Sequence, residues 1–179
     1  MVGVALVLLY FGLALLAAVI IMQPDRFVVT RDALIAAPPE RVFNLIAELR
    51  NWEDWSPWVE LDPKARRSYF GPPGGPGAGF EWSGNSKVGA GRLTVAASRP
   101  NEAIDIKLDF LRPLKASNDV SFRLAPEGAG TRVSWAMVGR NTLVSKALNL
   151  IRSRDKTIGG QFEQGLANLN RLASVAPAA

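Results

Sequence analysis

Reactive side chains are few in this sequence. It contains no cysteine and no histidine, which excludes disulfides, thiolate nucleophiles and histidine-based triads, and removes most zinc and iron sites. An enzyme built from this chain would have to use Asp, Glu, Lys, Tyr, Ser or backbone groups. Tyr69 and Glu81 are the nearest candidates for a buried tyrosine or carboxylate. Alternation with Phe80 and Trp82 predicts that Glu81 points outward, so no catalytic residue, cofactor or metal ligand is assigned.

The stretch from 155 to 173, DKTIGGQFEQGLANLNRLA, has the spacing of an amphipathic helix. Its apolar residues are Ile158, Phe162, Leu166, Leu169 and Leu172. Intervals of three and four place them on one helix face. Gly165 lies on that face, where a glycine costs roughly 1 kcal/mol relative to alanine. The missing side chain predicts a notch that is filled either by a closely packed strand backbone or by a ligand.

Strands with alternating apolar and polar residues precede this helix, most clearly at 104–110, 120–124 and 133–137. Consecutive strands joined by short turns predict an antiparallel sheet with one apolar face and one charged face. The residues expected to face the terminal helix are Ile104, Ile106, Leu108, Phe110, Val120, Phe122, Leu124, Val133, Trp135 and Met137. The residues expected to face water are Asp105, Lys107, Asp109, Arg123 and Arg132.

Further strands are predicted at 27–36, 80–82 and 92–98, with a helix that begins near Pro39 after the first of them. The glycine-rich stretch 71–79 is expected to connect two strands. It lacks the spacing of a dinucleotide fingerprint, and no Gly-Lys-Ser/Thr follows it, which argues against a phosphate site.

Three tryptophans lie close together at Trp52, Trp55 and Trp58, in a short turn or helix that Pro57 interrupts. We expect them to close one end of the core; the alternative is the rim of a pocket or an edge that faces a membrane. A second short helix is predicted after Asn141 or Thr142, either of which can cap it. Its expected inner face consists of Val144, Ala147, Leu148 and Ile151.

Residues 2–22 are uncharged and almost wholly apolar. As a helix they would extend about 30 Å, the thickness of a bilayer core. No Lys or Arg precedes this run and it is longer than the core of a signal peptide, which favours a transmembrane anchor over a cleaved segment or a buried core helix. Arg26, Arg31 and Arg41 follow it, so the positive-inside rule places the globular part in the cytoplasm.

Several motifs in this order resemble the START-like superfamily, also called SRPBCC, in its polyketide cyclase/dehydrase and lipid-transport branch. The motifs are APPERVF (37–43), NWEDWSPW (51–58), WSGN (82–85), VGAGRL (88–93), GTRVSW (130–135) and KTIGGQFEQGLANL (156–169). The resemblance covers roughly residues 27–173. It implies an α+β helix-grip fold, in which an antiparallel sheet wraps around a long C-terminal helix with a cavity between them. It carries no shared catalytic motif.

Three functions remain open. The first is a membrane-anchored binding domain for a hydrophobic small molecule or lipid, because such pockets are mostly apolar with a few polar groups. The second is a cyclase or dehydratase that uses a buried carboxylate or tyrosine. The third is an interaction or stress-response domain whose cavity is filled. The candidate ligand-binding residues are Trp82, Phe110, Phe122, Trp135, Met137, Phe162, Gly165 and Leu166.

The predicted organisation is an anchor at 1–22, a linker at 23–26, the START-like domain at 27–173 and a tail at 174–179. The expected localisation is a membrane crossed once, with the domain on the cytoplasmic side. The net charge of +5 suits an anionic membrane surface or anionic ligands, but a solvated basic exterior is the favoured explanation. A hydrophobic small molecule or lipid and the membrane are the expected partners, and nucleic acid is not.

Overall fold

The computed structural model describes residues 2–151 and 153–175, so residue 1 of the predicted anchor and residues 176–179 of the predicted tail lie outside it. The helices are α1 (Val2–Met22), α2 (Pro39–Ala47), the 3₁₀ turn η1 (Leu49–Asn51), α3 (Trp52–Trp55), α4 (Pro57–Leu61), α5 (Leu143–Ile151) and α6 (Arg154–Ser174). The strands are β1 (Arg26–Ile35), β2 (Arg66–Phe70), β3 (Gly79–Ser83), β4 (Ala90–Arg99), β5 (Ala103–Arg112), β6 (Ala116–Glu127) and β7 (Gly130–Arg140).

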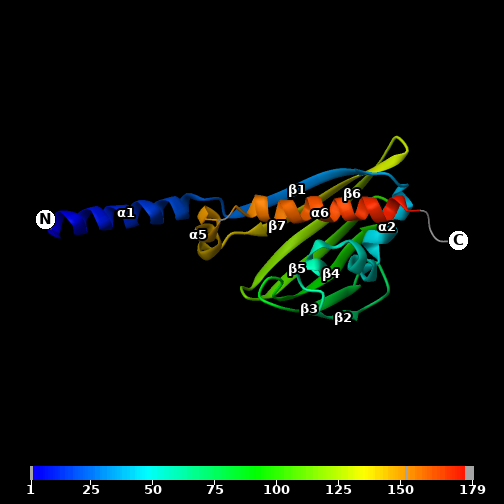
Figure 1. The fold of residues 1–179 in the computed structure, drawn as a ribbon, viewed down its shortest axis with the longest axis horizontal. Coiled ribbons are helices and arrows are strands. Elements are labelled where there is room, and N and C mark those ends of the chain that lie inside the picture. The colour runs from blue at the N-terminus through cyan, green and yellow to red at the C-terminus, as the bar shows by residue number, and fades with distance from the viewer. Residues whose placement is uncertain (1, 152, 176–179) are drawn as a thin grey trace.

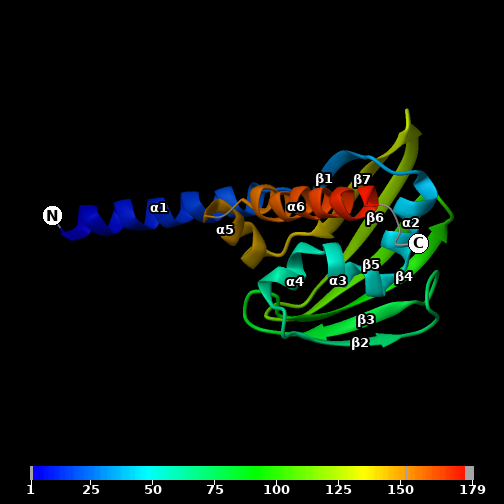
Figure 2. The ribbon, with the colours of Figure 1, turned by 45° about the vertical axis from the view of Figure 1, so that its right-hand side comes forward.

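The seven strands form one antiparallel sheet in the order β1-β7-β6-β5-β4-β3-β2. The sheet curls so that α6 lies along its concave side, with α2, α3 and α4 closing the space below the helix (Figures 1 and 2). The predicted α+β helix-grip architecture is confirmed. Of the strands, only β2 was not predicted, because the charged residues Arg66 and Arg67 obscure its alternation.

The two faces of the sheet follow the predicted alternation. On β5, Ile104 and Ile106 are almost wholly buried, while the Lys107 side chain between Ile106 and Leu108 keeps 45% of its surface exposed. On the outer face, cross-strand ion pairs join Arg123 to Asp105 and Lys107 to Asp119. The register is therefore the predicted one, and the charged residues interact with one another on the solvent side.

The short helices α2, α3 and α4 close one end of the core with aromatic rings. Proline occupies the first turn of both α2 and α4, where its missing N–H costs no helical hydrogen bond. Pro57 thus ends α3 and begins α4. Trp52 and Trp55 are buried, and their indole N–H groups donate to the carbonyls of Ile46 and Leu45, at 2.8 and 3.1 Å.

Helix α6 is fixed at both ends. The hydroxyl of Ser153 accepts a hydrogen bond from the Lys156 backbone N–H and caps the helix. Arg31 on β1 bonds Asp155 at 3.0 Å and Glu163 at 2.5 Å. Toward the other end, Asn170 accepts a hydrogen bond from the Ala36 backbone N–H at 2.8 Å. These contacts orient the apolar face of α6 toward the concave side of the sheet.

The prediction for α5 is correct in its cap and wrong in its orientation. The Thr142 hydroxyl accepts a hydrogen bond from the Ser145 N–H at 3.2 Å, as an N-cap does. Its predicted inner face instead points away from the domain, since Val144, Leu148 and Ile151 are 56%, 54% and 89% exposed. Lys146 is the buried residue of this helix. The helix packs its polar side inward, against the end of α1.

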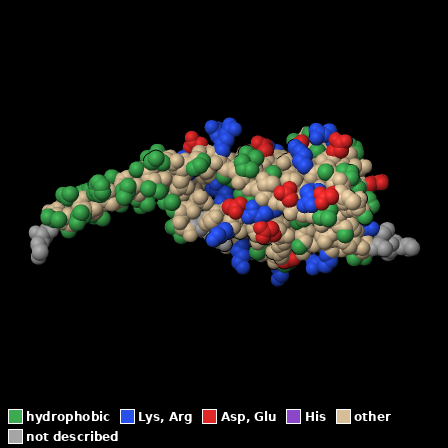
Figure 3. All heavy atoms as spheres, turned by 90° about the horizontal axis from the view of Figure 1, so that it is seen from above, with side chains coloured by type: hydrophobic (Ala, Val, Ile, Leu, Met, Phe, Trp, Pro, Cys, Tyr) green, Lys and Arg blue, Asp and Glu red, His purple; other side chains and the backbone are tan. Residues whose placement is uncertain are grey.

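Helix α1 projects from the domain as a separate rod (Figure 1). None of its residues is buried, its mean hydropathy over an 18-residue window is 2.9, and hydrophobic side chains cover its visible surface (Figure 3). By length and composition it is able to cross a membrane. A signal sequence has the same properties, so this helix alone fixes neither membrane attachment nor sidedness.

Candidate functional site

A cavity of about 340 Å³ lies between the concave side of the sheet and the short helices. Apolar side chains form most of its wall. They are Phe27, Leu49, Trp52, Trp58, Val59, Ala65, Phe80, Trp82, Val88, Leu93, Leu108, Phe110, Leu114, Ala116, Val120, Trp135, Met137 and Ile158. This volume falls at the lower end of the range for small-molecule pockets.

The structure places four of the eight predicted ligand-binding residues in the cavity wall. They are Trp82, Phe110, Trp135 and Met137. The other four, Phe122, Phe162, Gly165 and Leu166, lie in the packed core behind the wall. Their burial on the inner side is as predicted, but the Trp135 ring packs against Phe122, Phe162 and Gly165. Direct contact between a ligand and any of the eight remains a prediction.

The notch at Gly165 is occupied by a tryptophan ring rather than by a strand backbone or by empty space. A Cβ at this position would lie 2.7 Å from Cζ3 of Trp135 and 3.1 Å from Cδ of Pro57. The Trp135 ring stacks on Phe162, with ring centroids 4.1 Å apart and planes 8° apart. The glycine therefore makes room for an indole that forms the back wall of the cavity.

Several wall residues were not predicted as ligand contacts. Leu108 and Val120 have the inward alternation of their strands, and Trp52 and Trp58 belong to the tryptophan cluster for which a pocket rim was the alternative. Ile158 belongs to the predicted apolar face of the terminal helix, whereas Phe27 carried no such signal, because its position depends on how the start of β1 packs against the start of α6. Such long-range packing leaves no local pattern in the sequence.

Polar groups flank the apolar wall at one end. The Tyr69 hydroxyl donates a hydrogen bond to Oε1 of Glu53 at 2.6 Å, and the Arg50 guanidinium lies 4.4 Å from the centre of the Tyr69 ring. Burial and the bond to Glu53 raise the pKa of Tyr69 to about 12. The phenol therefore keeps its proton at neutral pH, and it can donate a hydrogen bond but is a poor general base.

The opposite end of the cavity lies near α1 and α5. Its polar lining includes Thr142, Ser145, Arg154, Arg140 and Lys115. The Arg154 guanidinium lies 4.1 Å from the centre of the Phe27 ring and also contacts Oδ1 of Asn141. Burial lowers the pKa of Arg154. The cavity is thus an apolar chamber with Tyr69, Glu53 and Arg67 at one end and Lys115, Arg140 and Arg154 at the other.

Glu81 lies where its alternation predicted. It is on the outer face of β3 and pairs with Arg92, so it does not line the cavity. Within residues 2–151 and 153–175 no group of three or more carboxylates is arranged to hold a metal ion. The polar groups of the cavity are suited to hydrogen bonding and, through the arginines and the lysine, to attracting negative charge.

Known structures share this architecture over most of the chain. A protein of Chromobacterium violaceum is 17% identical, with 86% of this chain and 99% of that chain covered and a TM-score of 0.60. A Mesorhizobium loti protein is 18% identical, with coverages of 85% and 100% and a TM-score of 0.63. The di-domain ARO/CYC BexL from the BE-7585A biosynthetic pathway is 16% identical, with coverages of 89% and 54% and a TM-score of 0.60. At these identities the likeness shows the fold alone.

Comparison with curated proteins gave no match. A family model does match the chain, over residues 26–174, which is the whole of the sheet and the helices packed against it. The protein belongs to the polyketide cyclase / dehydrase and lipid transport family.

Proposed function

We propose that this protein is a membrane-anchored binding domain whose cavity holds a hydrophobic small molecule or lipid. The observation that carries the proposal is the cavity itself, about 340 Å³ of space with a largely aromatic and aliphatic wall. Such a wall removes apolar ligand surface from water, at roughly 25 cal/mol per Å². Polar groups at the two ends would orient the ligand.

Two further observations support the proposal. The family to which the chain belongs includes lipid transport in its description. Helix α1 exposes a continuous apolar surface that is long enough to span a bilayer. A lipid-soluble ligand would be most concentrated in that bilayer. The arginines after α1, Arg26 and Arg31 among them, favour a cytoplasmic domain.

A cavity-filling substitution tests the proposal. Val120 lines the cavity from β6, so Val120→Phe would place a ring in the ligand's space. Val138→Phe is the matched control, because Val138 lies on the outer face of β7, 37% exposed. The full chain is purified in nanodiscs, its bound small molecules are identified by native mass spectrometry, and binding of a pyrene-labelled fatty acid is titrated.

We expect bound ligand in the native chain and in Val138→Phe, and at least a tenfold loss of probe affinity in Val120→Phe. Cooperative melting of all three proteins shows that the fold is retained. Failure of the native chain to bind any hydrophobic molecule would reject the binding function. Equal probe affinity in the two variants would place binding elsewhere on the protein.

A cyclase or dehydratase is the second candidate, and the Tyr69–Glu53 pair favours it. The phenol has a single O–H, which it donates to Glu53, so to stabilise negative charge that develops on a substrate oxygen it would have to turn that O–H from the carboxylate to the substrate. If a polyketone substrate is converted, Tyr69→Phe should lower turnover roughly 100-fold, the usual effect of removing one such donor. Unchanged turnover in this variant would remove Tyr69 from the reaction.

A further inference from the structure

Helix α5 packs with its polar side inward and its apolar side exposed. Leu143, Val144, Ala147, Leu148 and Ile151 follow at helical spacing and form one face. Four of them are large residues, and between 54% and 89% of the surface of each is exposed. A soluble domain normally buries such a face, and a contiguous exposed patch of this kind marks an interaction surface.

Contacts with the end of α1 hold α5 in this orientation. The Lys146 ammonium lies 2.7 Å from Oδ1 of Asp25 and 3.2 Å from the Ile21 carbonyl oxygen. The Gln23 side chain donates to the Lys146 carbonyl at 3.0 Å. The cation of α5 thus satisfies the carboxyl end of α1, where positive charge is favourable. The exposed face of α5 therefore begins at the level where α1 ends.

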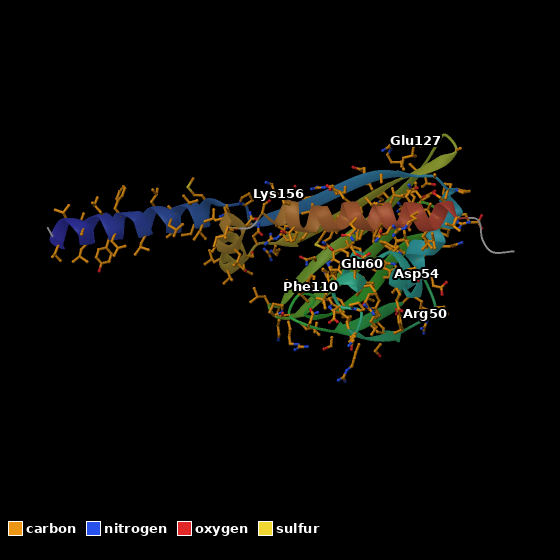
Figure 4. The ribbon with its side chains drawn as sticks, in the orientation of Figure 1. Arg50, Asp54, Glu60, Phe110, Glu127 and Lys156 are labelled. Carbon is orange, nitrogen blue, oxygen red and sulfur yellow. The ribbon has the colours of Figure 1, made fainter. Side chains whose placement is uncertain are left out.

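A second exposed apolar segment lies at the same end of the domain. Leu111 and Leu114, in and after the last residues of β5, are 51% and 52% exposed. Phe110, just before them, lies on the side of the domain toward α1, whereas Glu127 lies at the opposite end (Figure 4). Residues 111–115, which comprise the end of β5 and the β5–β6 turn, thus present leucine side chains at the α1 end of the domain, and α5 presents leucine, valine and isoleucine side chains there.

Five of the six exposed residues of the cavity wall lie in or beside these two segments, and we take this side as the mouth of the cavity. The exposed residues of the cavity wall at this end are Leu114, Lys115, Ala116, Arg140 and Thr142. Glu53 is the exposed wall residue at the other end. Because the β5–β6 turn and the start of α5 both belong to the wall, a molecule leaving through this mouth passes between the two exposed apolar segments.

Charge at this end is suited to lipid headgroups. Arg26, Lys115 and Arg140 are exposed here. Of the nearby carboxylates, Asp25 and Asp155 are paired with Lys146 and Arg31, and Asp109 accepts a hydrogen bond from Ser117. Cations beside an apolar helix face are typical of helices that lie in a membrane interface, where they attract anionic headgroups.

We propose that α5 and the β5–β6 turn lie in the interface of the bilayer that α1 spans, and that the cavity exchanges its hydrophobic ligand directly with that bilayer. The proposal rests on the proposed function, since it needs both the anchor and a ligand. The continuity of the α5 face with the end of α1, together with the cations, selects a lipid surface over a protein partner.

The absence of cysteine from the sequence allows a direct test of membrane contact in the full chain. Val144→Cys and Ile151→Cys each carry a nitrobenzoxadiazole label in vesicles of phosphatidylcholine and phosphatidylglycerol. Leu34→Cys is the control, an exposed leucine (48%) that pairs with Arg132 at the far end of the sheet. Quenching by lipids with a spin label near the headgroup is compared with quenching by iodide in water.

We expect spin-labelled lipid to quench positions 144 and 151 at least threefold more than position 34, with the reverse order for iodide. If iodide quenches all three positions equally, α5 lies in water and the proposal is wrong. If positions 144 and 151 are shielded from both quenchers, a protein covers α5, which also overturns the proposal.

Ligand exchange is tested with the same vesicles and a pyrene-labelled fatty acid as probe. Leu148→Glu introduces a charge on the α5 face, and Leu34→Glu is its control. We expect uptake of probe from the vesicle to slow at least tenfold in Leu148→Glu, with unchanged binding at saturation, and no change in Leu34→Glu. Equal uptake rates would reject exchange through this mouth.

The two experiments separate the possible failures. If the native chain binds no probe but positions 144 and 151 contact lipid, the proposed binding function fails and the membrane contact of α5 stands. If the probe binds but the two labels do not contact lipid, the proposed function stands and the exchange route fails.

Discussion

Gly165 and Trp135 are complementary in shape, and this makes the glycine sensitive to substitution. We predict that Gly165→Ala destabilises the protein by about 1–3 kcal/mol, the usual range for overpacking. The added Cβ would lie 2.7 Å from the Trp135 ring, and contacts of that ring with Phe162, Phe122 and Trp55 resist its displacement. The measurement is urea unfolding of the full chain in detergent, followed by tryptophan fluorescence.

Gly160 provides the matched control on the same helix. A Cβ at Gly160 would meet nothing within 4 Å among the described residues. Gly160→Ala should therefore stabilise the protein by up to about 1 kcal/mol, through helix propensity alone. A free energy of unfolding for Gly165→Ala that equals that of Gly160→Ala would contradict the tight packing of Gly165 against Trp135.

The Tyr69 phenol should titrate at a pH near 12, above the ordinary tyrosine value of 10.0, because it is partly buried and bonded to Glu53. The sequence has two tyrosines, so Tyr10→Phe leaves Tyr69 as the only phenol. Absorbance at 295 nm then follows its ionisation. Adding Glu53→Gln should lower the pKa while leaving it above the ordinary value, because burial is the larger cause.

The raised pKa of Tyr69 also has a consequence for stability. The unfolded chain loses the phenolic proton first, so the contribution of Tyr69 is complete below pH 10 and is lost as the pH rises toward about 12. In the Tyr10→Phe background, the free energy of unfolding should fall more steeply over this interval with Tyr69 present than with Tyr69→Phe. Parallel pH dependences would show that the phenol is not perturbed.

The sequence pattern predicts which way a side chain points better than it predicts whether that side chain borders a cavity. Alternation placed Trp135, Met137 and Phe122 on the inner face, and the structure confirms it. Alternation does not show whether a gap or another side chain lies in front of an inward residue. Phe122 packs against other aromatic rings, whereas Met137 lines the cavity. This difference depends on the packing of segments that are distant in the sequence.

At the scale of elements, α5 shows what periodicity leaves undetermined. Helical spacing identifies an apolar face and a polar face, but it does not say which one turns toward the domain. In α5 the polar face turns inward because the Lys146 ammonium bonds the Asp25 carboxylate and the Ile21 carbonyl at the end of α1. The long helix α6 and most strands were predictable because their apolar faces have a core to cover. The sequence of α5 alone does not indicate that the end of α1 lies against it.

The ion pair at α5 leads to a prediction about that helix. Lys146→Met keeps the length of the side chain and removes its charge, so Asp25 and the Ile21 carbonyl lose their partner. We expect the backbone amides of α5 to exchange with deuterium severalfold faster near neutral pH. Amides of β7 should be unaffected, because β7 pairs with two strands. Unchanged exchange in α5 would mean that Lys146 does not hold it.

The pH dependence of α5 follows from the same pair. The hydrogen bond from Lys146 lowers the pKa of Asp25 below its ordinary value of 3.8. A lowered carboxyl pKa means that the contribution to stability is present above 3.8 and is lost only as the pH falls through the lowered value. Packing of α5 against α1 should therefore be constant between pH 5 and 8.

At the scale of the whole molecule, α1 is separate from the core, since none of its residues is buried. We predict that a protein beginning at Gln23 folds cooperatively and stays soluble. It would keep Pro24 and Asp25, whose carbonyls accept hydrogen bonds from Asn141 at 2.8 Å. Circular dichroism during heating tests folding. A fragment that begins at Asn141, expressed from the same vector, serves as an unfolded reference. A melt without a transition would show that α1 contributes to the core.

The short passage from α1 to β1 has a consequence for how the protein meets other molecules. Helix α1 ends at Met22 and β1 begins at Arg26, so three residues, Gln23 to Asp25, join them. Such a segment spans at most roughly 10 Å. With α1 in the bilayer, as proposed, the domain cannot leave the surface and cross the aqueous gap to a second membrane. The domain would diffuse only in the plane of its own membrane, and it would bind and release its ligand there. Any protein that takes cargo from it would have to come to that surface.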